Sequence, residues 1–236
     1  MTLKGSTPRR PDEQSFSDAG KLILGLGAGG HARVIIDAIR MAGNYEIVGL
    51  IDQSESTRGQ SVDGVEVLGG EARLEEFLSR GVHYVFNGVG GVANNAWHAA
   101  IHERVSALGF EFLTIIHPAA VVASTAIIGA GSVVLARSVI NAGAVLGRNT
   151  IINTGAIVEH DCVVGEHSHV APGAVLLGNV TVGKRCLIGA NAVVRQGLTV
   201  GDLATVGAGA VVASDVSSGM SVIGVPAKPL YAYSIL

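Results

Sequence analysis

A hydrophobic residue recurs every six positions over residues 121–216, and this period predicts the fold of the C-terminal half. When the segment is divided into sixteen hexads starting at Val121, every second position is Val, Ile or Leu. The sixth positions hold Ala, Ser, Thr, Cys, Val or Leu, and seven third positions are Gly, which we interpret as turn residues. One short strand and one turn per hexad predict a parallel β-helix.

The repeat contains no Phe, Tyr or Trp, although these residues occur elsewhere in the chain. Their absence fits a β-helix whose interior is too narrow for aromatic rings. An inward aliphatic side chain contributes roughly 1.5–3 kcal/mol when it is fully buried. We therefore expect the repeat to form its own core without help from the rest of the chain.

The pattern ahead of the repeat changes to alternating strands and helices. Apolar strands are predicted over 21–27, 45–52 and 82–91. Helical spacing follows over 31–43, with Gly43 as a C-cap, and over 70–81 and 93–109. This alternation predicts a small parallel α/β sheet, which we place in residues 21–112. The β-helix and its tail then occupy residues 113–236.

A glycine motif lies where the first predicted strand meets the first helix. Gly25, Gly27 and Gly30 form G-x-G-x-x-G, and Asp52 ends the next predicted strand, at the distance from Gly30 that such motifs show. A strand, a glycine turn, a helix and an acid in this order are typical of phosphate binding at a helix N-terminus. The alternative is that the glycines only permit close helix packing. Because residues 21 to about 110 supply half of a dinucleotide fold, the pattern favours a mononucleotide.

Charge and composition narrow the class of protein. A net charge of −3 gives no reason to expect nucleic acid or an anionic membrane as a partner. Residues 1–20 are polar, lack the hydrophobic core of a signal peptide, and are expected to be a disordered lead-in. Cys162 and Cys186 occupy sixth hexad positions, where we expect packed thiols and not a disulfide or metal site. These features predict a cytoplasmic protein.

Four motifs occur in a characteristic order. They are GAGGHAR at 27–33, HPAA at 117–120, NTGAIVEHDCVVGEHSHVAPGA at 153–174 and GVPAK at 224–228. In this order the chain resembles, over about residues 21 to 232, the sugar O-/N-acyltransferases of the sialic-acid O-acetyltransferase and PglD type. The resemblance implies a left-handed β-helix with three hexads per coil. It further implies a homotrimer that binds acetyl-CoA between neighbouring β-helices and uses no metal.

Three hexads per coil stack each residue on its counterpart three hexads further along, so His160 and Gly178 share one column. The resemblance implies that His160 is the general base, because a neutral imidazole is suited to accept a proton from an attacking amine. Asp161, in place of the commoner Glu, would orient the ring. The backbone N–H of Gly178 would stabilise the oxyanion. The same stacking places His169 beside Leu187.

Further residues are expected to hold the two substrates. The resemblance implies that His169 contacts the acetyl carbonyl or the pantetheine of acetyl-CoA, near Gly178 and Leu187. The candidates for contact with the CoA phosphates are the cations Lys184, Arg185, Arg195 and Lys228. His167 matches no motif and is expected at the surface, and Glu159 is expected to be a turn carboxylate. The sugar nucleotide is expected to contact Gly27, Gly29, Gly30, His31, Asp52, Asn87, Gly88 and Gly90.

The implied reaction is transfer of an acetyl group to the 4-amino group of a GDP- or UDP-linked 4-amino-4,6-dideoxy sugar. O-acetylation of the sialic-acid type is the alternative within the family. A γ-class carbonic anhydrase, with zinc on His160, His167 and His169, and a sugar-nucleotide sensor without catalysis are two alternatives outside it. A fragment beginning near His117 is expected to trimerise and bind CoA but to lose the sugar nucleotide.

Overall fold

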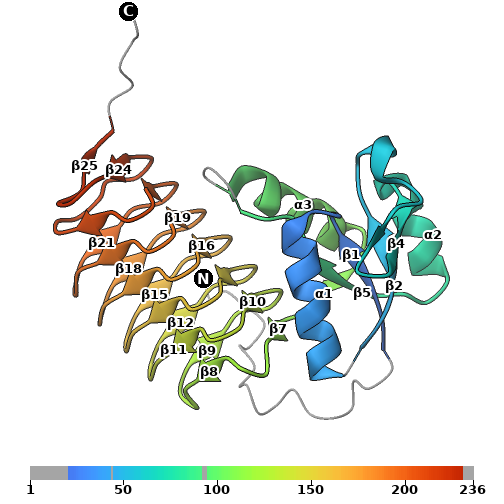
Figure 1. The fold of residues 1–236 in the computed structure, drawn as a ribbon, viewed down its shortest axis with the longest axis horizontal. Coiled ribbons are helices and arrows are strands. Elements are labelled where there is room, and N and C mark those ends of the chain that lie inside the picture. Colours follow the sequence, from blue (N-terminus) through green and yellow to red (C-terminus); the bar gives the residue numbers. More distant parts are fainter. Residues whose placement is uncertain (1–20, 44, 92–94, 231–236) are drawn as a thin grey trace, which may run out of the picture.

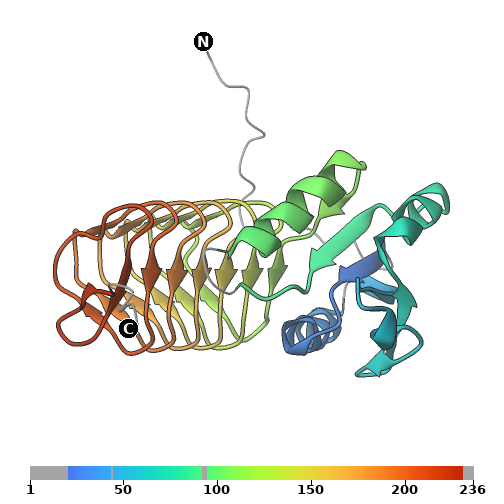
Figure 2. The ribbon, with the colours of Figure 1, turned by 90° about the horizontal axis from the view of Figure 1, so that it is seen from above.

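The computed structural model describes residues 21–43, 45–91 and 95–230, which form an α/β domain followed by a parallel β-helix (Figure 1). The β-helix is an elongated body with the α/β domain beside one of its ends (Figure 2). Both predicted fold classes are thus confirmed. The predicted lead-in, residues 1–20, lies outside the described residues. Among the described residues, no helix has the length and apolar character needed to cross a membrane.

The α/β domain contains a six-stranded sheet with the order β3-β4-β2-β1-β5-β6. All neighbouring pairs are parallel except β3 and β4, so the predicted parallel sheet gains an antiparallel edge. Asp63 and Gly64, both with positive φ, form the two-residue turn of this hairpin. The strands are β1 (Lys21–Leu26), β2 (Tyr45–Ile51), β3 (Ser61–Val62), β4 (Val65–Gly69), β5 (Tyr84–Asn87) and β6 (Glu111–Phe112).

Within the described residues, three α-helices and the short 3-10 helices η3 and η4 connect these strands. The first α-helix begins after Gly29 and ends at Gly43, whose φ of 74° and N–H bond to the carbonyl of Ile39 confirm the predicted C-cap. Its buried face includes Ile35 and Ile36, which pack in one core cluster with the sheet. The helices are α1 (Gly30–Ala42), η3 (Glu55–Thr57), η4 (Glu71–Arg73), α2 (Leu74–Ser79) and α3 (Ala96–Ala107).

The β-helix has three faces of parallel strands, except that β25 pairs antiparallel with β24 at the end of face 1. Each hexad contributes a two-residue strand at its first and second positions. Face 1 contains β7 (Ile115–Ile116), β10 (Val133–Val134), β13 (Ile151–Ile152), β16 (His169–Val170), β19 (Leu187–Ile188), β22 (Thr205–Val206), β24 (Ser221–Ile223) and β25 (Lys228–Pro229). Face 2 contains β8 (Val121–Val122), β11 (Val139–Ile140), β14 (Ile157–Val158), β17 (Val175–Leu176), β20 (Val193–Val194) and β23 (Val211–Val212). Face 3 contains β9 (Ile127–Ile128), β12 (Val145–Leu146), β15 (Val163–Val164), β18 (Thr181–Val182) and β21 (Thr199–Val200).

Strands that neighbour each other on a face come from hexads one full coil apart, as in the pairing of Val133 with Ile151. The second-position side chains form one continuous buried core together with the small sixth-position residues. Cys162 and Cys186 lie in this core as free, buried thiols, which confirms the predicted packing.

The hexad turn differs from the one we predicted. The residue with positive φ is the fifth of every hexad except the first and the last, as at Gly143, Asp161 and Asn179. The third-position glycines are required for another reason. A Cβ at Gly147 would lie 2.6 Å from the backbone nitrogen of Glu166 in the next coil, so only glycine permits the coils to approach so closely.

The two domains share a core where the α/β domain packs on face 1. Ile115, Val133 and Leu135 of the β-helix are buried in one cluster with residues of α1 and the sheet, among them Ile35 and Phe86. The inward column of the β-helix is therefore not its only apolar surface. Our expectation that the repeat needs no help from the rest of the chain is incomplete, because the α/β domain covers part of face 1.

Candidate active site

His160 and Asp161 form a hydrogen-bonded pair in the turn between β14 and β15. His160 Nδ1 lies 2.9 Å from Asp161 Oδ2, and both side chains are largely exposed. Because the carboxylate accepts only from a protonated nitrogen, Nδ1 carries the proton, and in the neutral imidazole this leaves Nε2 with a free lone pair. Asp161 adopts a φ of 59°, which Asp tolerates better than most residues because its short side chain bonds locally.

Two glycines in neighbouring coils make room for this pair. A Cβ at Gly178 would lie 2.5 Å from His160 Nε2, and a Cβ at Gly143 would lie 2.6 Å from Asp161 Oδ1. The imidazole therefore lies directly against the backbone of Gly178, which confirms their predicted shared column. Any side chain at either glycine would displace a member of the pair.

The pair lies away from the α/β domain of its own chain. The turn that carries His160 and Asp161 joins face 2 to face 3. The pair therefore lies at the corner opposite face 1. Arg195, which follows β20 in the same corner, is exposed nearer the C-terminal end. Lys184 and Arg185 lie instead in the corner between faces 3 and 1, and Lys228 lies on β25. The predicted CoA cations are thus distributed over different sides of the β-helix.

His169 contacts the α/β domain. Its Nδ1 lies 2.9 Å from the carbonyl oxygen of Gly91, and Asn153 Nδ2 lies 3.0 Å from its Nε2. The ring is buried, and burial is the main cause that lowers the pKa of His169. His169 pairs with Leu187 across β16 and β19, as the stacking of three hexads per coil predicts.

His167 is buried, so the prediction that it lies at the surface is wrong. Its Nδ1 lies 2.8 Å from Asn149 Nδ2, and its ring lies edge-on to His102 of α3 at 5.3 Å between centroids. His98 of α3 approaches the carbonyl oxygens of Val89 and Asn149 at 2.7 and 3.2 Å. The sequence did not indicate this polar domain junction, because residues distant in the chain build it.

The glycine turn after β1 is held by the acid that the motif predicted. Asp52 Oδ2 accepts a hydrogen bond from the backbone N–H of Ala28 at 2.8 Å, and Asp52 Oδ1 accepts one from Ser54 at 2.9 Å. Gly27 has a φ of 91°. The structure therefore assigns Asp52 a role in fixing the turn, and its contact with a nucleoside stays a prediction.

The N-terminus of α1 is open for an anion. A Cβ at Gly29 or Gly30 would meet no atom within 4 Å, so close packing does not explain these two glycines. No side chain caps the helix, and its first turn contains no acidic residue. Its free N–H groups and its dipole suit a phosphate group.

His31 follows in the first turn of α1. Its Nε2 is buried and has no hydrogen-bond partner among the described residues. Burial, with His169 and His98 nearby, lowers the pKa of His31 to about 3. His31 is therefore neutral near pH 7, and Gly90 lies close to its side chain.

Two other predicted substrate residues have structural contacts. Asn87 is buried, and its Nδ2 donates to the carbonyl of His98 at 3.1 Å and to Asn149 Oδ1 at 3.3 Å. A Cβ at Gly88 would lie 2.8 Å from Ala32 Cβ, so this glycine permits α1 to pack closely. Both residues help to position the sheet edge that carries the glycine turn.

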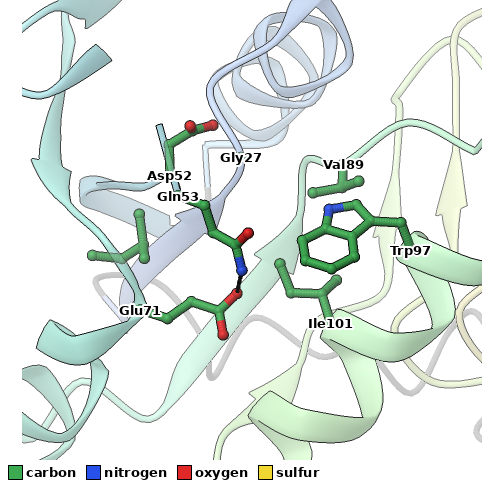
Figure 3. Close-up of a pocket in the computed structure, with 8 residues that line it drawn as sticks. Gly27, Asp52, Gln53, Glu71, Val89, Trp97 and Ile101 are labelled. Carbon is green, nitrogen blue, oxygen red and sulfur yellow. Dashed lines mark hydrogen bonds between the residues drawn. The ribbon is translucent and has the colours of Figure 1, made fainter. Parts of the chain in front are cut away.

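A pocket of about 110 Å³ opens at that edge, at the carboxyl ends of the parallel strands (Figure 3). Asp52, Gln53 and Glu71 lie on one side of it, and Val89, Trp97 and Ile101 lie on the other. Of these only Asp52 was a predicted site residue. The sequence did not indicate Gln53, Glu71 or Trp97 as site residues, because they come from three segments that are far apart in the chain.

Comparisons with known proteins agree with this architecture. The family model of the PglD N-terminal domain matches residues 21–105. Models of the bacterial transferase hexapeptide (six repeats) and of the hexapeptide repeat of succinyl-transferase match residues 143–178 and 179–214. The chain is 32% identical over 108 residues, or 46% of its length, to UDP-N-acetylbacillosamine N-acetyltransferase of Bacillus subtilis. That match spans about half of the curated relative, 48% of its length.

Two solved structures match over nearly their whole length. The acetyltransferase domain of PglB from Neisseria gonorrhoeae is 41% identical, with a TM-score of 0.82 over 89% of this chain and 100% of that one. PerB from Caulobacter crescentus, in complex with CoA and GDP-perosamine, is 35% identical, with a TM-score of 0.83 over 90% of this chain and 98% of that one. Because relatives at this identity share both domains, the chain belongs to the PglD-type hexapeptide-repeat acetyltransferases.

Proposed function

We propose that this protein is an acetyl-CoA-dependent N-acetyltransferase whose acceptor is the 4-amino group of a nucleotide-linked 4-amino-4,6-dideoxy sugar. The observation that carries the proposal is the pairing of His160 with Asp161 against the backbone of Gly178. The relatives support it, because one is an N-acetyltransferase by name and PerB was solved with CoA and GDP-perosamine.

The pair is built to remove a proton. Asp161 holds the proton on Nδ1 of His160, so Nε2 accepts the proton that the amine loses as it attacks. Acetyl-CoA supplies the thioester carbonyl. As the new C–N bond forms and the tetrahedral intermediate collapses, the C–S bond breaks and CoA leaves as the thiol, with the proton that His160 removed from the amine. The absence of a side chain at Gly178 lets Nε2 lie against its backbone, and the N–H of Gly178 is the candidate donor to the developing oxyanion.

The α/β domain supplies the acceptor site in this proposal. The uncapped start of α1, with open space at Gly29 and Gly30, fits the diphosphate of a nucleotide-linked sugar. His31, in the same turn, is neutral and has an unpaired buried nitrogen that suits a sugar hydroxyl or amine. Asp52 acts mainly by holding the turn.

A homotrimer would complete the site. Within one chain, His160 lies at the corner opposite the face on which the α/β domain packs. A neighbouring chain is therefore the natural source of the base for each nucleotide site. CoA would lie between adjacent β-helices, where cations from different sides of the helix, such as Arg195 and Lys184, meet.

The carbonic anhydrase alternative finds no support in this geometry. His167 and His169 are buried and bonded within the chain, whereas His160 is exposed at another corner. Among the described residues, no cluster of three metal-ligating side chains occurs. Zinc analysis of the purified protein tests this alternative directly.

Turnover by the full-length protein, supplied with acetyl-CoA and UDP-, GDP- or dTDP-linked 4-amino sugars, tests the proposed function. We expect His160→Ala to lower kcat by about 10²–10⁴, the range for loss of a general base, while CoA binding is retained. Glu159→Gln, in the same exposed turn, is the matched control and should keep normal turnover. Near-normal activity of His160→Ala would refute the role of this residue, and release of acetate or O-acetyl product would refute N-acylation.

A further inference from the structure

The peptide group between Leu177 and Gly178 lies beside the imidazole of His160. Its N–H end belongs to Gly178 and has no hydrogen-bond acceptor among the described residues. A free N–H is what a developing oxyanion requires. Because a peptide group is planar and rigid, the direction of this N–H is set by whatever holds the carbonyl of Leu177 at the other end.

The peptide groups on either side are held by the backbone of neighbouring coils. The N–H of Leu177 donates to the carbonyl of Val194 at 3.0 Å. The N–H of Asn179 donates to the carbonyl of His160 at 2.9 Å. In the described part of the chain, however, no backbone N–H donates to the carbonyl of Leu177. The peptide group that carries the N–H of Gly178 is therefore held by something other than the backbone.

The thiol of Cys162, one coil below, contacts this carbonyl. Cys162 Sγ donates to the carbonyl oxygen of Leu177 at 3.2 Å, and the backbone N–H of Val180 donates to the sulfur. The thiol thus bridges two groups that bond directly in other hexads, as Ala192 does to Gly189 at 3.0 Å. Burial raises the pKa of the Cys162 thiol, so it keeps its proton near pH 7 and remains a donor.

We propose that Cys162 is a positioning residue for the acetyl transfer: its S–H holds the carbonyl of Leu177 and thereby aims the N–H of Gly178 at the oxyanion. A hydrogen bond to the carbonyl also polarises the peptide group, which makes the N–H at its other end a stronger donor. Cys162 itself is buried in the core of the β-helix and touches no reacting atom. This inference rests on the proposed function and adds to it the residue behind the oxyanion donor.

Other sixth-position residues of the repeat supply a conservative substitution and a control. Ser168 Oγ donates to the carbonyl of Gly183 at 2.8 Å and accepts from the N–H of Cys186 at 2.9 Å, so serine forms the same bridge. Cys186 Sγ donates to the carbonyl of Gly201 at 3.1 Å, in the corner between faces 3 and 1. That corner does not carry the catalytic turn, so Cys186 is the matched control for Cys162.

Steady-state kinetics of the full-length protein, with acetyl-CoA and an acceptor that it turns over, test the proposal. Cys162→Ala should lower kcat by about 10-fold, a part of the 10²–10³ that loss of a whole oxyanion donor costs. Both KM values should stay unchanged, because the thiol contacts neither substrate. Cys162→Ser should restore most of kcat, and Cys186→Ala should keep normal turnover. Circular dichroism checks that each variant is folded.

The pH dependence of kcat/KM separates this role from an indirect effect on the base. In Cys162→Ala the imidazole of His160 and its bond to Asp161 are untouched, so the pH profile should keep its shape and fall only in height. A profile that shifts along the pH axis would mean that the substitution displaces the base, and it would contradict the proposal.

Amide NMR of ¹⁵N-labelled full-length protein without substrates tests the contact independently of turnover. The amide resonance of a residue responds to a hydrogen bond at the carbonyl of the same peptide group. The resonance of Gly178 should therefore shift in Cys162→Ala and return toward its original position in Cys162→Ser. Cys186→Ala should leave it in place.

Four results would overturn the inference. They are an unchanged kcat in Cys162→Ala, an equal loss in Cys186→Ala, a loss that Cys162→Ser does not relieve, and a Gly178 resonance that does not respond to Cys162. The proposed function fails separately, if the unmodified protein acetylates no nucleotide-linked amino sugar. In that case the Gly178 resonance still shows whether Cys162 holds the peptide group.

Discussion

At the scale of single residues, the positions around His160 are determined by what the neighbouring coils leave open. Asp161 occupies the fifth hexad position, where the backbone turns with positive φ, and its carboxylate reaches back to the preceding ring. Gly143 below and Gly178 above provide the space. The exposed pair therefore depends on two glycines that carry no functional group of their own.

Gly178→Ala is expected to displace the imidazole. The new Cβ would lie 2.5 Å from Nε2, and the exposed ring can move away at little cost to stability. Since a misplacement of about 1 Å can cost about 10²-fold in rate, kcat should fall by about that factor while the melting temperature stays unchanged. Steady-state kinetics and thermal unfolding measure the two effects, and unchanged kcat would show that the column does not position the base.

At the scale of elements, the turn after β1 illustrates how a binding motif also stabilises the fold. The two carboxylate oxygens of Asp52 join the glycine turn to the segment that follows β2. The phosphate-binding start of α1 is thereby tied to the neighbouring strand. Any loss of nucleotide affinity after a change at Asp52 must be separated from loss of this connection.

Asp52→Ala is expected to lower the free energy of unfolding by about 1–3 kcal/mol, because it removes the charged acceptor of two backbone N–H groups. Urea unfolding checks this value. Asp52→Asn is the control, because its amide oxygen retains one acceptor and should recover part of the loss. If Asp52→Ala weakens nucleotide binding without any loss of stability, direct contact with the nucleoside is the better explanation.

At the scale of the whole molecule, the junction between the domains is expected to weaken in acid. Burial, with nearby His167, Arg148 and His98, lowers the pKa of His102 to about 3. Burial and the nearby charge of Arg148 lower the pKa of His167 to about 4, although Glu166 and Glu103 oppose the shift.

The unfolded chain binds these protons near pH 6.5 and the folded chain does not, so stability falls as the pH drops from about 6.5 toward 4. Each proton that only the unfolded chain binds lowers the free energy of unfolding by about 1.4 kcal/mol per pH unit. Urea unfolding at a series of pH values should show this slope. His102→Phe, which keeps a ring against Phe112, should make it shallower; an identical slope would contradict the assignment.

The separation of His160 from the α/β domain predicts complementation between subunits. A chain with His160→Ala keeps its nucleotide site, and a chain with Gly30→Trp, whose new side chain fills the open space at the start of α1, keeps its base. Co-expressed with different affinity tags, the two inactive chains should form hybrid oligomers that recover part of the activity. Hybrids without activity would indicate that each chain uses its own His160.

The domain junction also changes what a truncation can show. A fragment beginning near His117 loses β7 and uncovers Val133 and Leu135, which pack against the α/β domain. It exposes buried polar residues of the corner between faces 3 and 1 as well, among them His167 and Asn149. Reduced solubility of such a fragment would therefore not decide where CoA binds, and substitutions in the full-length chain are the sharper test.

The sequence by itself determined the β-helix, the column shared by His160 and Gly178, and the glycine turn before α1. The hexad period predicts a β-helix, and the resemblance to the acyltransferase family implied the three hexads per coil that stack Gly178 on His160. A strand followed by a glycine turn is a local pattern. Only the tertiary structure revealed that His167 is buried, that Asp52 holds the turn, and that Gln53, Glu71 and Trp97 line one pocket. These features arise where elements that are distant in the chain come into contact. Such contacts leave no periodic pattern in the sequence.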